Sequence, residues 1–126
     1  EIIGVEKPEQ TDGISFLPSL QGKVQEKHEY LNWEFQLSGW FQALPDGGFR
    51  QSARIGKWKG VRYGIDSKIE LYDLSDDESE TNDLSKKHPE IIARISEIFK
   101  TSRNETAAFP YGGVEQNHIS MDRYKD

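Results

Sequence analysis

The stretch FRQSARIGKWKGVRY, residues 49–63, decides the fold. In its first half, apolar side chains alternate with polar ones, as in a half-buried β-strand: Phe49, Ala53 and Ile55. Gly56 interrupts the pattern briefly, and a second apolar group follows: Trp58, Val61 and Tyr63. Because Trp58 falls on the other parity from the rest of its group, we expect a β-bulge at Gly60. Two strands joined by a tight turn are predicted.

Upstream of this stretch, residues 45–48 (PDGG) form a dense turn signal, and before them residues 30–35 (YLNWEF) alternate again. Leu31, Trp33 and Phe35 share one side of a predicted first strand. Downstream, residues 69–74 (IELYDL) carry apolar groups on both sides, which predicts a central fourth strand. The connections are too short for crossovers, so we expect an antiparallel meander.

The helical signal follows the predicted sheet. Pro89 and Glu90 are typical of a first helical turn, and apolar residues then recur at helical spacing: Ile91, Ile92, Ile95, Ile98 and Phe99. Glu90 precedes Arg94 by four residues, a weakly favourable pair, and Lys100 and Arg103 suit the negative end of the helix dipole. The sequence therefore predicts an α+β fold in which a four-stranded antiparallel β-sheet packs against one α-helix that ends near Arg103.

The pattern divides the chain into three parts: a lead-in over residues 1–28, an α+β subdomain over residues 29–110 and an irregular tail over residues 111–126. Pro8, Gly13, Pro18 and Gly22 punctuate the lead-in, where no periodicity runs long enough to predict an element. The chain starts with Glu1, and its one methionine is Met121. We therefore expect it to be part of a longer translation product.

Length and composition restrict the function. A chain of 126 residues supports one modest core. No apolar run approaches the roughly 18 residues of a membrane span, and residues 1–10 lack the pattern of a signal peptide, so no membrane contact is expected. The absence of cysteine excludes disulfides, thiolate metal sites and a cysteine nucleophile.

Charge is segregated along the sequence. Residues 50–68 carry a net charge of +5 and residues 70–90 carry −6, and we expect the two stretches to be neighbours in space. Most such runs are solvated faces. The basic residues, interleaved with Trp58 and Tyr63, also suit small anionic groups such as sulfate or carboxylate. The net charge of −6 for the whole chain argues against nucleic acid as a partner.

Few residues are arranged for chemistry. A calcium loop starting at Asp73 fails at its sixth position, where Glu78 replaces glycine, and at its twelfth, where Leu84 replaces glutamate. We expect Asp77, Asn82 and Asp83 to make turns with their own backbone instead. The three histidines are not at metal-ligand spacing: His28, His88 and His118. Phosphate-loop, dinucleotide and nucleophile-elbow motifs are absent, and the Asn104 glycosylation triplet carries little weight.

Five segments resemble one known family. They are residues 12–22 (DGISFLPSLQG), 30–35 (YLNWEF), 51–59 (QSARIGKWK), 69–74 (IELYDL) and 77–84 (DESETNDL). In this order they are similar to the C-terminal domain of type I sulfatases, the arylsulfatase A-like, formylglycine-dependent family of the alkaline-phosphatase-like superfamily. Glu78 stands where that family usually has proline. The resemblance covers about residues 12–110 and implies the same α+β subdomain.

The resemblance also implies where the chemistry lies. In this family a formylglycine, made from Cys or Ser in a C/S-x-P-S/A-R signature, attacks the sulfate ester beside a calcium ion, in the N-terminal domain. Residues 16–20 share only the Pro18-Ser19 pair with that signature, so no catalytic residue, metal site or cofactor is expected on this chain. Calcium and formylglycine are implied for an N-terminal sulfatase domain, which would be this chain's partner.

The expected role is to complete the fold and the substrate cleft of a sulfuric ester hydrolase acting on a sulfated carbohydrate or an aryl sulfate. Trp40 and Phe41 could stack on a sugar or aryl ring, or else pack against the catalytic domain, and Arg50 and Arg54 could contact an anionic group. The alternative is a free-standing carbohydrate- or anion-binding module. The resemblance suggests a periplasmic or secreted location and leaves the sulfate ester and the oligomeric state open.

Overall fold

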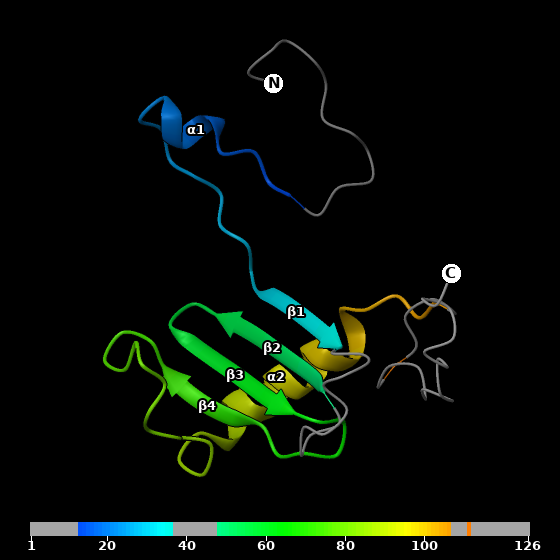
Figure 1. Ribbon diagram of the computed structural model, residues 1–126. Helices are drawn as coiled ribbons and strands as arrows, with labels where there is room; N and C mark the ends of the chain where they lie inside the picture. Colours follow the sequence, from blue (N-terminus) through cyan, green and yellow to red (C-terminus); the bar gives the residue numbers. More distant parts are fainter. Residues whose placement is uncertain (1–12, 37–47, 107–110, 112–126) are drawn as a thin grey trace, which may run out of the picture.

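The computed structural model describes residues 13–36, 48–106 and 111 (Figure 1). Their elements are α1 (Leu17–Leu20), β1 (Leu31–Gln36), β2 (Phe49–Ile55), β3 (Trp58–Tyr63), β4 (Glu70–Asp73) and α2 (Pro89–Thr101). The four strands form one sheet in the order β1-β2-β3-β4, and every neighbouring pair is antiparallel. The predicted meander, followed by one long helix, is confirmed.

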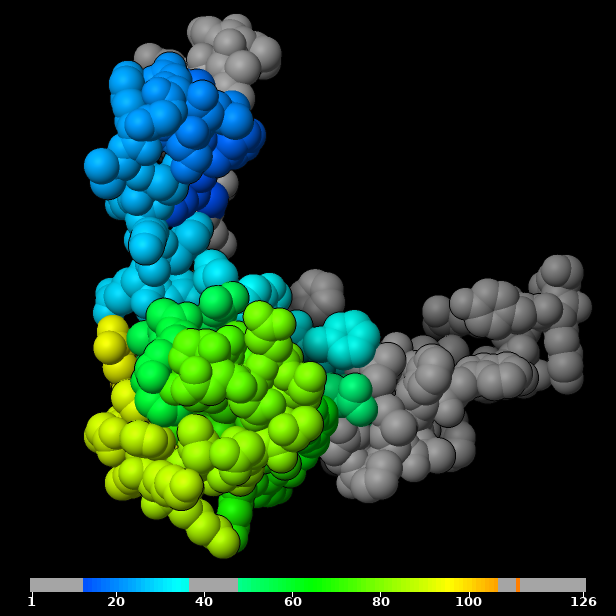
Figure 2. All heavy atoms as spheres, turned by 90° about the vertical axis from the view of Figure 1, so that its left-hand side faces the viewer, coloured from blue at the N-terminus to red at the C-terminus, as the bar shows by residue number. Residues whose placement is uncertain are grey.

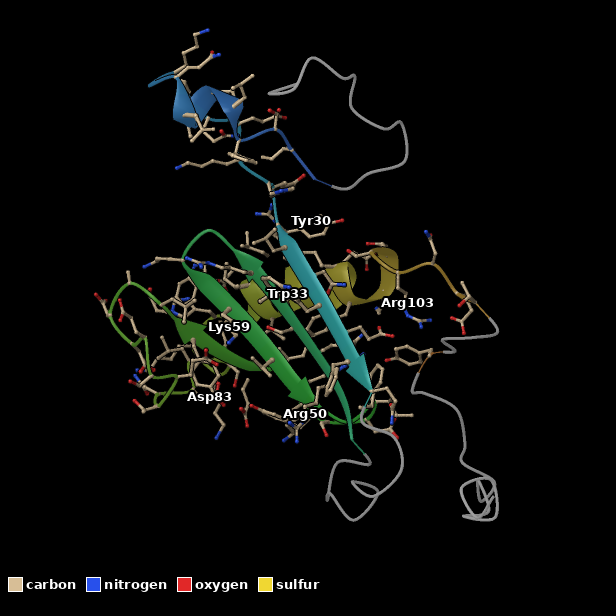
Figure 3. The ribbon with its side chains drawn as sticks, turned by 45° about the horizontal axis from the view of Figure 1, so that its top comes forward. Tyr30, Trp33, Arg50, Lys59, Asp83 and Arg103 are labelled. Carbon is tan, nitrogen blue, oxygen red and sulfur yellow. The ribbon has the colours of Figure 1, made fainter. Side chains whose placement is uncertain are left out.

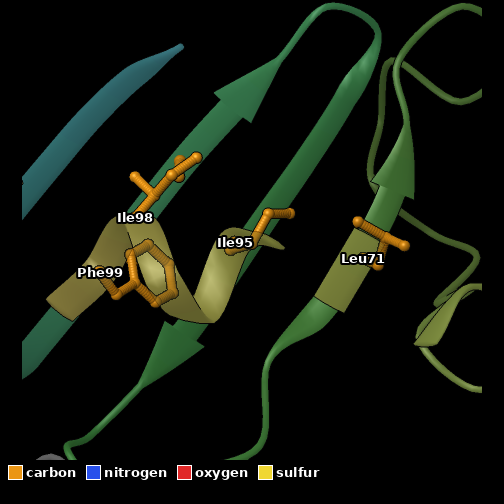
Figure 4. Close-up of a cluster of buried hydrophobic side chains, with 5 residues drawn as sticks. Leu71, Ile95, Ile98 and Phe99 are labelled. Atoms are coloured by element: carbon orange, nitrogen blue, oxygen red, sulfur yellow. The ribbon is translucent and has the colours of Figure 1, made fainter. Parts of the chain in front are cut away.

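Helix α2 lies across one face of the sheet (Figure 1). It begins at Pro89 with Glu90 in its first turn and has Lys100 in its last, as the sequence indicates. Its predicted apolar stripe is buried against β2, β3 and β4, and the cluster of side chains is seen in Figure 4: Ala53, Leu71, Ile95, Ile98 and Phe99. Burial of this stripe is the main stabilising contact of the domain.

Gly60 explains how closely the helix approaches. The predicted bulge is wrong, because β2 and β3 pair without interruption from Arg50↔Tyr63 to Ile55↔Trp58. A Cβ atom at Gly60 would lie 2.7 Å from Cδ1 and 2.8 Å from Cγ2 of Ile95, closer than non-bonded carbons approach. The glycine therefore marks the point where α2 is pressed against the sheet, which is the other common reason for glycine in a strand.

Strand β4 lies at an edge of the sheet, so the prediction that it is central is wrong. Its apolar residues are covered on the outer side by the loop that follows. The backbone N–H of Leu71 donates to the Asp83 carboxylate at 3.0 Å, and the Leu71 carbonyl accepts from the N–H of Leu84 at 2.8 Å. Leu71 and Tyr72 are both buried, although they point to opposite faces. A covering loop produces the same sequence pattern as a second neighbouring strand.

Strand β1 is oriented opposite to what its apolar side suggests. Leu31, Trp33 and Phe35 do share one face, but it is the face turned away from α2, and they are 37%, 52% and 54% exposed. Glu34 points toward the helix side and binds Arg103, which follows α2, at 3.0 Å; both side chains are largely buried. The Glu34 carboxylate also accepts from Gln51 at 2.7 Å. The strand is thus held to the helix by polar contacts.

The segment preceding β1, residues 13–30, stands away from the sheet and helix (Figure 2), and we call it the arm. It contains α1, a single helical turn that the sequence analysis missed because four residues show no periodicity. Two parts of the arm are linked by Gln25, whose side-chain amide donates a hydrogen bond to the Ser15 carbonyl at 2.7 Å. Three apolar side chains of the arm are strongly exposed: Phe16, Leu20 and Val24.

The close approach at Gly60 predicts a specific energetic coupling. Gly60→Ala should destabilise the fold by ~1–3 kcal/mol, because the added methyl group overlaps Ile95. In an Ile95→Ala background the same substitution should cost less, since the two overlapping Ile95 atoms are gone and only Cγ2 of Ile69, at 3.2 Å, remains close. Urea unfolding followed by circular dichroism measures both differences. Equal costs in the two backgrounds would contradict the account of Gly60.

Candidate functional site

The face of the sheet turned away from α2 carries exposed aromatic and charged side chains, and we call it the open face. The strand register places on it side chains from β1, β2 and β3: Leu31, Trp33, Phe35, Arg50, Ser52, Arg54, Lys59, Val61 and Tyr63. It therefore combines exposed aromatic rings with guanidinium groups. Of the basic stretch that the sequence analysis singled out, Tyr63 lies on this face, whereas Trp58 and Arg62 lie on the side that faces α2. Figure 3 shows Trp33 and Arg50 on their strands.

Arg50 and Arg54, the two predicted anion contacts, lie on this face toward opposite ends of β2. Four residues of strand separate them, which is about 13 Å at ~3.3 Å per residue. The Arg50 guanidinium lies 5.3 Å from the centre of the Tyr63 ring, and the Arg54 Nε donates to the Gly56 carbonyl at 3.0 Å. The pair therefore suits two separate anionic groups better than a single one.

Trp40 and Phe41, the predicted ring-stacking residues, lie outside the described residues. Their connection leaves the sheet after Gln36 and returns at Phe49, and these two residues are directly paired. Arg50 follows immediately, at the end of the sheet opposite Tyr30 (Figure 3). Both ends of the connection are thus beside Arg50, whereas Arg54 lies near the turn at Gly56.

The basic and acidic stretches meet in space, as predicted. Lys57 donates to the Asp73 carboxylate at 2.6 Å, and Lys59 forms an ion pair with Glu80. The hydrogen bond from Lys57, with a second from Ser75, lowers the pKa of Asp73 to about 2. Lys59 is thus held by an acid of the neighbouring loop.

The carboxylates of the acidic loop make turns, which confirms the interpretation for Asp77 and Asp83. Asp77 accepts hydrogen bonds from the backbone N–H groups of Thr81 and Asn82, both at 2.9 Å, and these lower its pKa. Burial opposes the charge on Asp83, but the N–H groups of Leu71 and Ser85 outweigh it, so its pKa also falls. With their oxygens used in this way, these acids do not fit a calcium ion. Among residues 13–36, 48–106 and 111, no three acidic or histidine side chains gather as a metal site would require.

A polar network behind β1 was not anticipated. Gln51 is only 1% exposed and accepts from Arg62 Nε at 2.8 Å, while its own amide donates to Glu34. The guanidinium of Arg62 lies 5.3 Å from the Phe99 ring centre and also binds the Tyr111 hydroxyl. In the sequence, Gln51 shares the parity of the apolar Phe49 and Ala53, and this was the available signal. The network fastens the end of α2 to β1 and β2 and has no free nucleophile.

Two hollows lie where the arm meets the sheet. One, of about 370 Å³, is lined by apolar and polar residues of the segment before β1 and by the Arg54 end of the open face: Ile14, Phe16, Gln25, Lys27, Leu31 and Arg54. The other, of about 610 Å³, lies beside the outer edge of β1 and is more polar: His28, Glu29, Asn32, Ser102 and Asn104. In the described part of the chain, no helix is long and apolar enough to span a membrane.

Fold and motifs together define a sulfatase-like α+β domain, and comparison with known proteins supports this class. A stretch of 47 residues is 41% identical to the N-acetylgalactosamine-6-O-sulfatase of Bacteroides thetaiotaomicron, which amounts to 37% of this chain and 9% of that protein. No family model matches the chain.

Solved sulfatase structures match a larger part of the chain. A putative sulfatase from Bacteroides thetaiotaomicron superimposes on 77% of it with a TM-score of 0.65 and 27% identity, and a 2-O GAG sulfatase superimposes on 79% with a TM-score of 0.64 and 26% identity. This chain spans only about a fifth of either protein, 21% in each case. The predicted resemblance to sulfatases is therefore confirmed in sequence and fold, for a part of their length.

The ion pair between Lys57 and Asp73 makes stability depend on pH. Because the pKa of Asp73 is lowered to about 2 from the ordinary 3.8, its contribution is present above pH 4 and is lost as the pH falls from about 4 to 2. The stability deficit of Asp73→Asn should accordingly be largest at pH 7 and should vanish near pH 2. Urea midpoints at pH 7, 4, 3 and 2 measure it. Asp76→Asn removes an equal charge from the same turn and is the control; a deficit of Asp73→Asn that does not change with pH would contradict the role of the pair.

Proposed function

We propose that this chain is a non-catalytic domain of a sulfatase and completes the fold and the substrate cleft of the whole enzyme. The single observation that supports this most is the match of over three quarters of the chain to about a fifth of solved sulfatases. In those proteins the corresponding domain is one part of a longer chain. The order of the motifs resembles that of the C-terminal domain of type I sulfatases.

The chemistry of sulfate ester hydrolysis supports placing catalysis in another domain of the sulfatase. The reaction needs a strong nucleophile and cations that stabilise charge on the transferring group. The acids of the described loop are used in turns and ion pairs, and the open face supplies guanidinium groups but no activated nucleophile beside them. In this proposal, formylglycine and calcium belong to the N-terminal domain, and this chain contributes binding surface alone.

The substrate that suits the proposal best is a sulfated carbohydrate. The relatives are described as an N-acetylgalactosamine-6-O-sulfatase and a 2-O GAG sulfatase. A further structure, with 21% identity and a TM-score of 0.55, is described in complex with its substrate D-glucosamine-2-N,6-O-disulfate; at that identity it supports the fold alone. Two separated guanidinium groups on the open face suit a ligand with more than one anionic group.

The reading frame and an activity assay test the proposed function. The polypeptide that contains this chain should carry a C/S-x-P-S/A-R signature and release sulfate from 4-nitrophenyl sulfate or from a sulfated N-acetylgalactosamine. The 126-residue chain alone should give no release above buffer. Turnover by the chain alone would overturn the non-catalytic role, and a reading frame without the signature would overturn the sulfatase assignment.

Substitutions on the open face test the cleft contacts. In the whole enzyme, Arg50→Ala should raise KM for a sulfated oligosaccharide by roughly three- to tenfold with kcat unchanged, as expected when a charged contact made equally in ground and transition states is lost. Arg50→Lys should recover part of the loss, and Arg54→Ala should have the smaller effect, because Arg54 lies farther from the connection that carries Trp40 and Phe41. Unchanged KM for both alanine variants would remove these residues from the cleft.

Trp40→Ala distinguishes the two roles proposed for the ring-bearing connection. A residue that stacks on a sugar raises KM and leaves the melting temperature unchanged, whereas one that packs on the catalytic domain lowers the melting temperature. Phe41→Ala is read in the same way.

A further inference from the structure

Tyr111 follows α2 in the sequence and lies against the end of the sheet at which β2 begins and β3 ends. Its ring meets the Phe49 ring edge-on, with 5.5 Å between the ring centres and 74° between the planes. Its hydroxyl accepts a hydrogen bond from Arg62. Phe49 is the first residue of β2 and Arg62 is the last but one of β3. A residue from a distant part of the chain therefore joins two strands at one end of the sheet.

Residues just after α2 hold Tyr111 in this place. The backbone N–H of Tyr111 donates to the Glu105 carboxylate at 3.0 Å, and Glu105 forms an ion pair with Arg103. The guanidinium of Arg103 lies 5.2 Å from the centre of the Tyr111 ring, and that of Arg62 lies 5.8 Å from it. An aromatic ring beside two cations is favourably placed. Tyr111 is thus fixed through its backbone, its ring and its hydroxyl together.

The two sheet residues that Tyr111 contacts directly precede Arg50 and Tyr63 in the sequence. Arg50 and Tyr63 are paired across β2 and β3, and the Arg50 guanidinium lies 5.3 Å from the Tyr63 ring centre. Successive side chains of a strand point to opposite faces of the sheet. Tyr111 therefore lies on the α2 side of the same two strand ends that carry Arg50 and Tyr63 on the open face.

These strand ends are the part of the sheet that most needs such support. Strand termini open more readily than strand centres. The connection from β1 returns to the sheet at Phe49, and β3 leaves it after Tyr63. Beyond the ladder, the Gly64 N–H donates to the Phe49 carbonyl at 2.7 Å. Phe49 itself is only 3% exposed, so removal of the Tyr111 ring should uncover it and loosen both strand ends.

We propose that Tyr111 is a positioning residue for substrate binding, which keeps Arg50 where an anionic group of the substrate can meet it; this rests on the proposed function. A guanidinium on a loose strand end binds an anion more weakly, because ordering the backbone and the side chain then costs free energy on binding. Tyr111 acts through the strand ends and makes no substrate contact of its own, since it lies on the other face of the sheet. The region after α2 thereby contributes to substrate affinity at a distance.

A double-mutant cycle in the whole enzyme tests the positioning role. Tyr111→Ala should raise KM for a sulfated oligosaccharide roughly two- to fivefold with kcat unchanged, and Tyr111→Phe, which keeps the ring, should recover most of the loss. In an Arg50→Ala background, Tyr111→Ala should raise KM no further, because the group that it positions is gone. In an Arg54→Ala background, the matched control, it should raise KM by the same factor as in the unsubstituted enzyme. An equal factor in both backgrounds, or an unchanged KM for Tyr111→Ala, would refute the positioning role.

Hydrogen exchange of the same preparations, followed by mass spectrometry, separates this inference from the proposed function. Two amides outside the ladder report on opposite ends of β3: Gly64, bonded to the Phe49 carbonyl at 2.7 Å, and Leu74, bonded to the Lys57 carbonyl at 2.9 Å. Tyr111→Ala should accelerate exchange at Gly64 roughly fivefold or more and leave Leu74 unchanged, since only the nearer end loosens. Equal acceleration at both amides would make Tyr111 a general stabilising residue and refute the proposal. Sulfate release without a change at Gly64 refutes the positioning role alone, and a local change at Gly64 without sulfate release refutes the proposed function alone.

Discussion

The contact between Ile95 and Gly60 is the constraint on which the rest of the structure depends. A row of paired residues crosses the sheet beneath the helix, Ala53, Gly60 and Leu71, and two of the three have almost no side chain. The small residues let α2 settle directly on β2 and β3, which brings Ile98 and Phe99 into contact with the sheet and completes the core. Packing at this distance leaves the helix one position along the strands, because a shift would bring a larger side chain beneath Ile95.

That position of the helix determines how β1 is used. Helix α2 packs on β2, β3 and Leu71 of β4, and Arg103, two residues past its end, binds Glu34 of β1. The inner side of β1 is therefore polar: burial opposes the charge on Arg103, but its hydrogen bond and charge interaction with Glu34 outweigh this and raise its pKa. The apolar side of the strand is left to face outward. The loop after β4 covers that strand, whereas the outward side of β1 stays exposed.

The periodicity of the apolar residues predicted the strands and α2 correctly, and the features that it missed show its limits. The strands, their antiparallel order and α2 follow from alternation and helical spacing, which local side-chain contacts enforce. The unbroken pairing at Gly60, the edge position of β4 and the side of β1 that faces the helix could not be obtained in this way, because each depends on what lies across the sheet: Ile95, the loop around Asp83, and Arg103. Alternation reveals that a strand has two sides but not which side faces the helix.

The candidate site shows the same difference between what the sequence indicates and what the tertiary contacts add. The sequence placed Arg50 and Arg54 together on one strand face, and the structure separates them by the length of that strand and gives each a different surrounding, Tyr63 for one and the Gly56 turn for the other. The acidic loop shows the opposite case. Its many carboxylates suggest a cation site, but they accept hydrogen bonds from backbone N–H groups of the same loop. What decides function in both cases is whether a charged group already has a partner in the fold. In the described part of this domain the acids are largely paired within the chain, whereas Leu31, Trp33 and Phe35 on the outward side of β1 remain exposed.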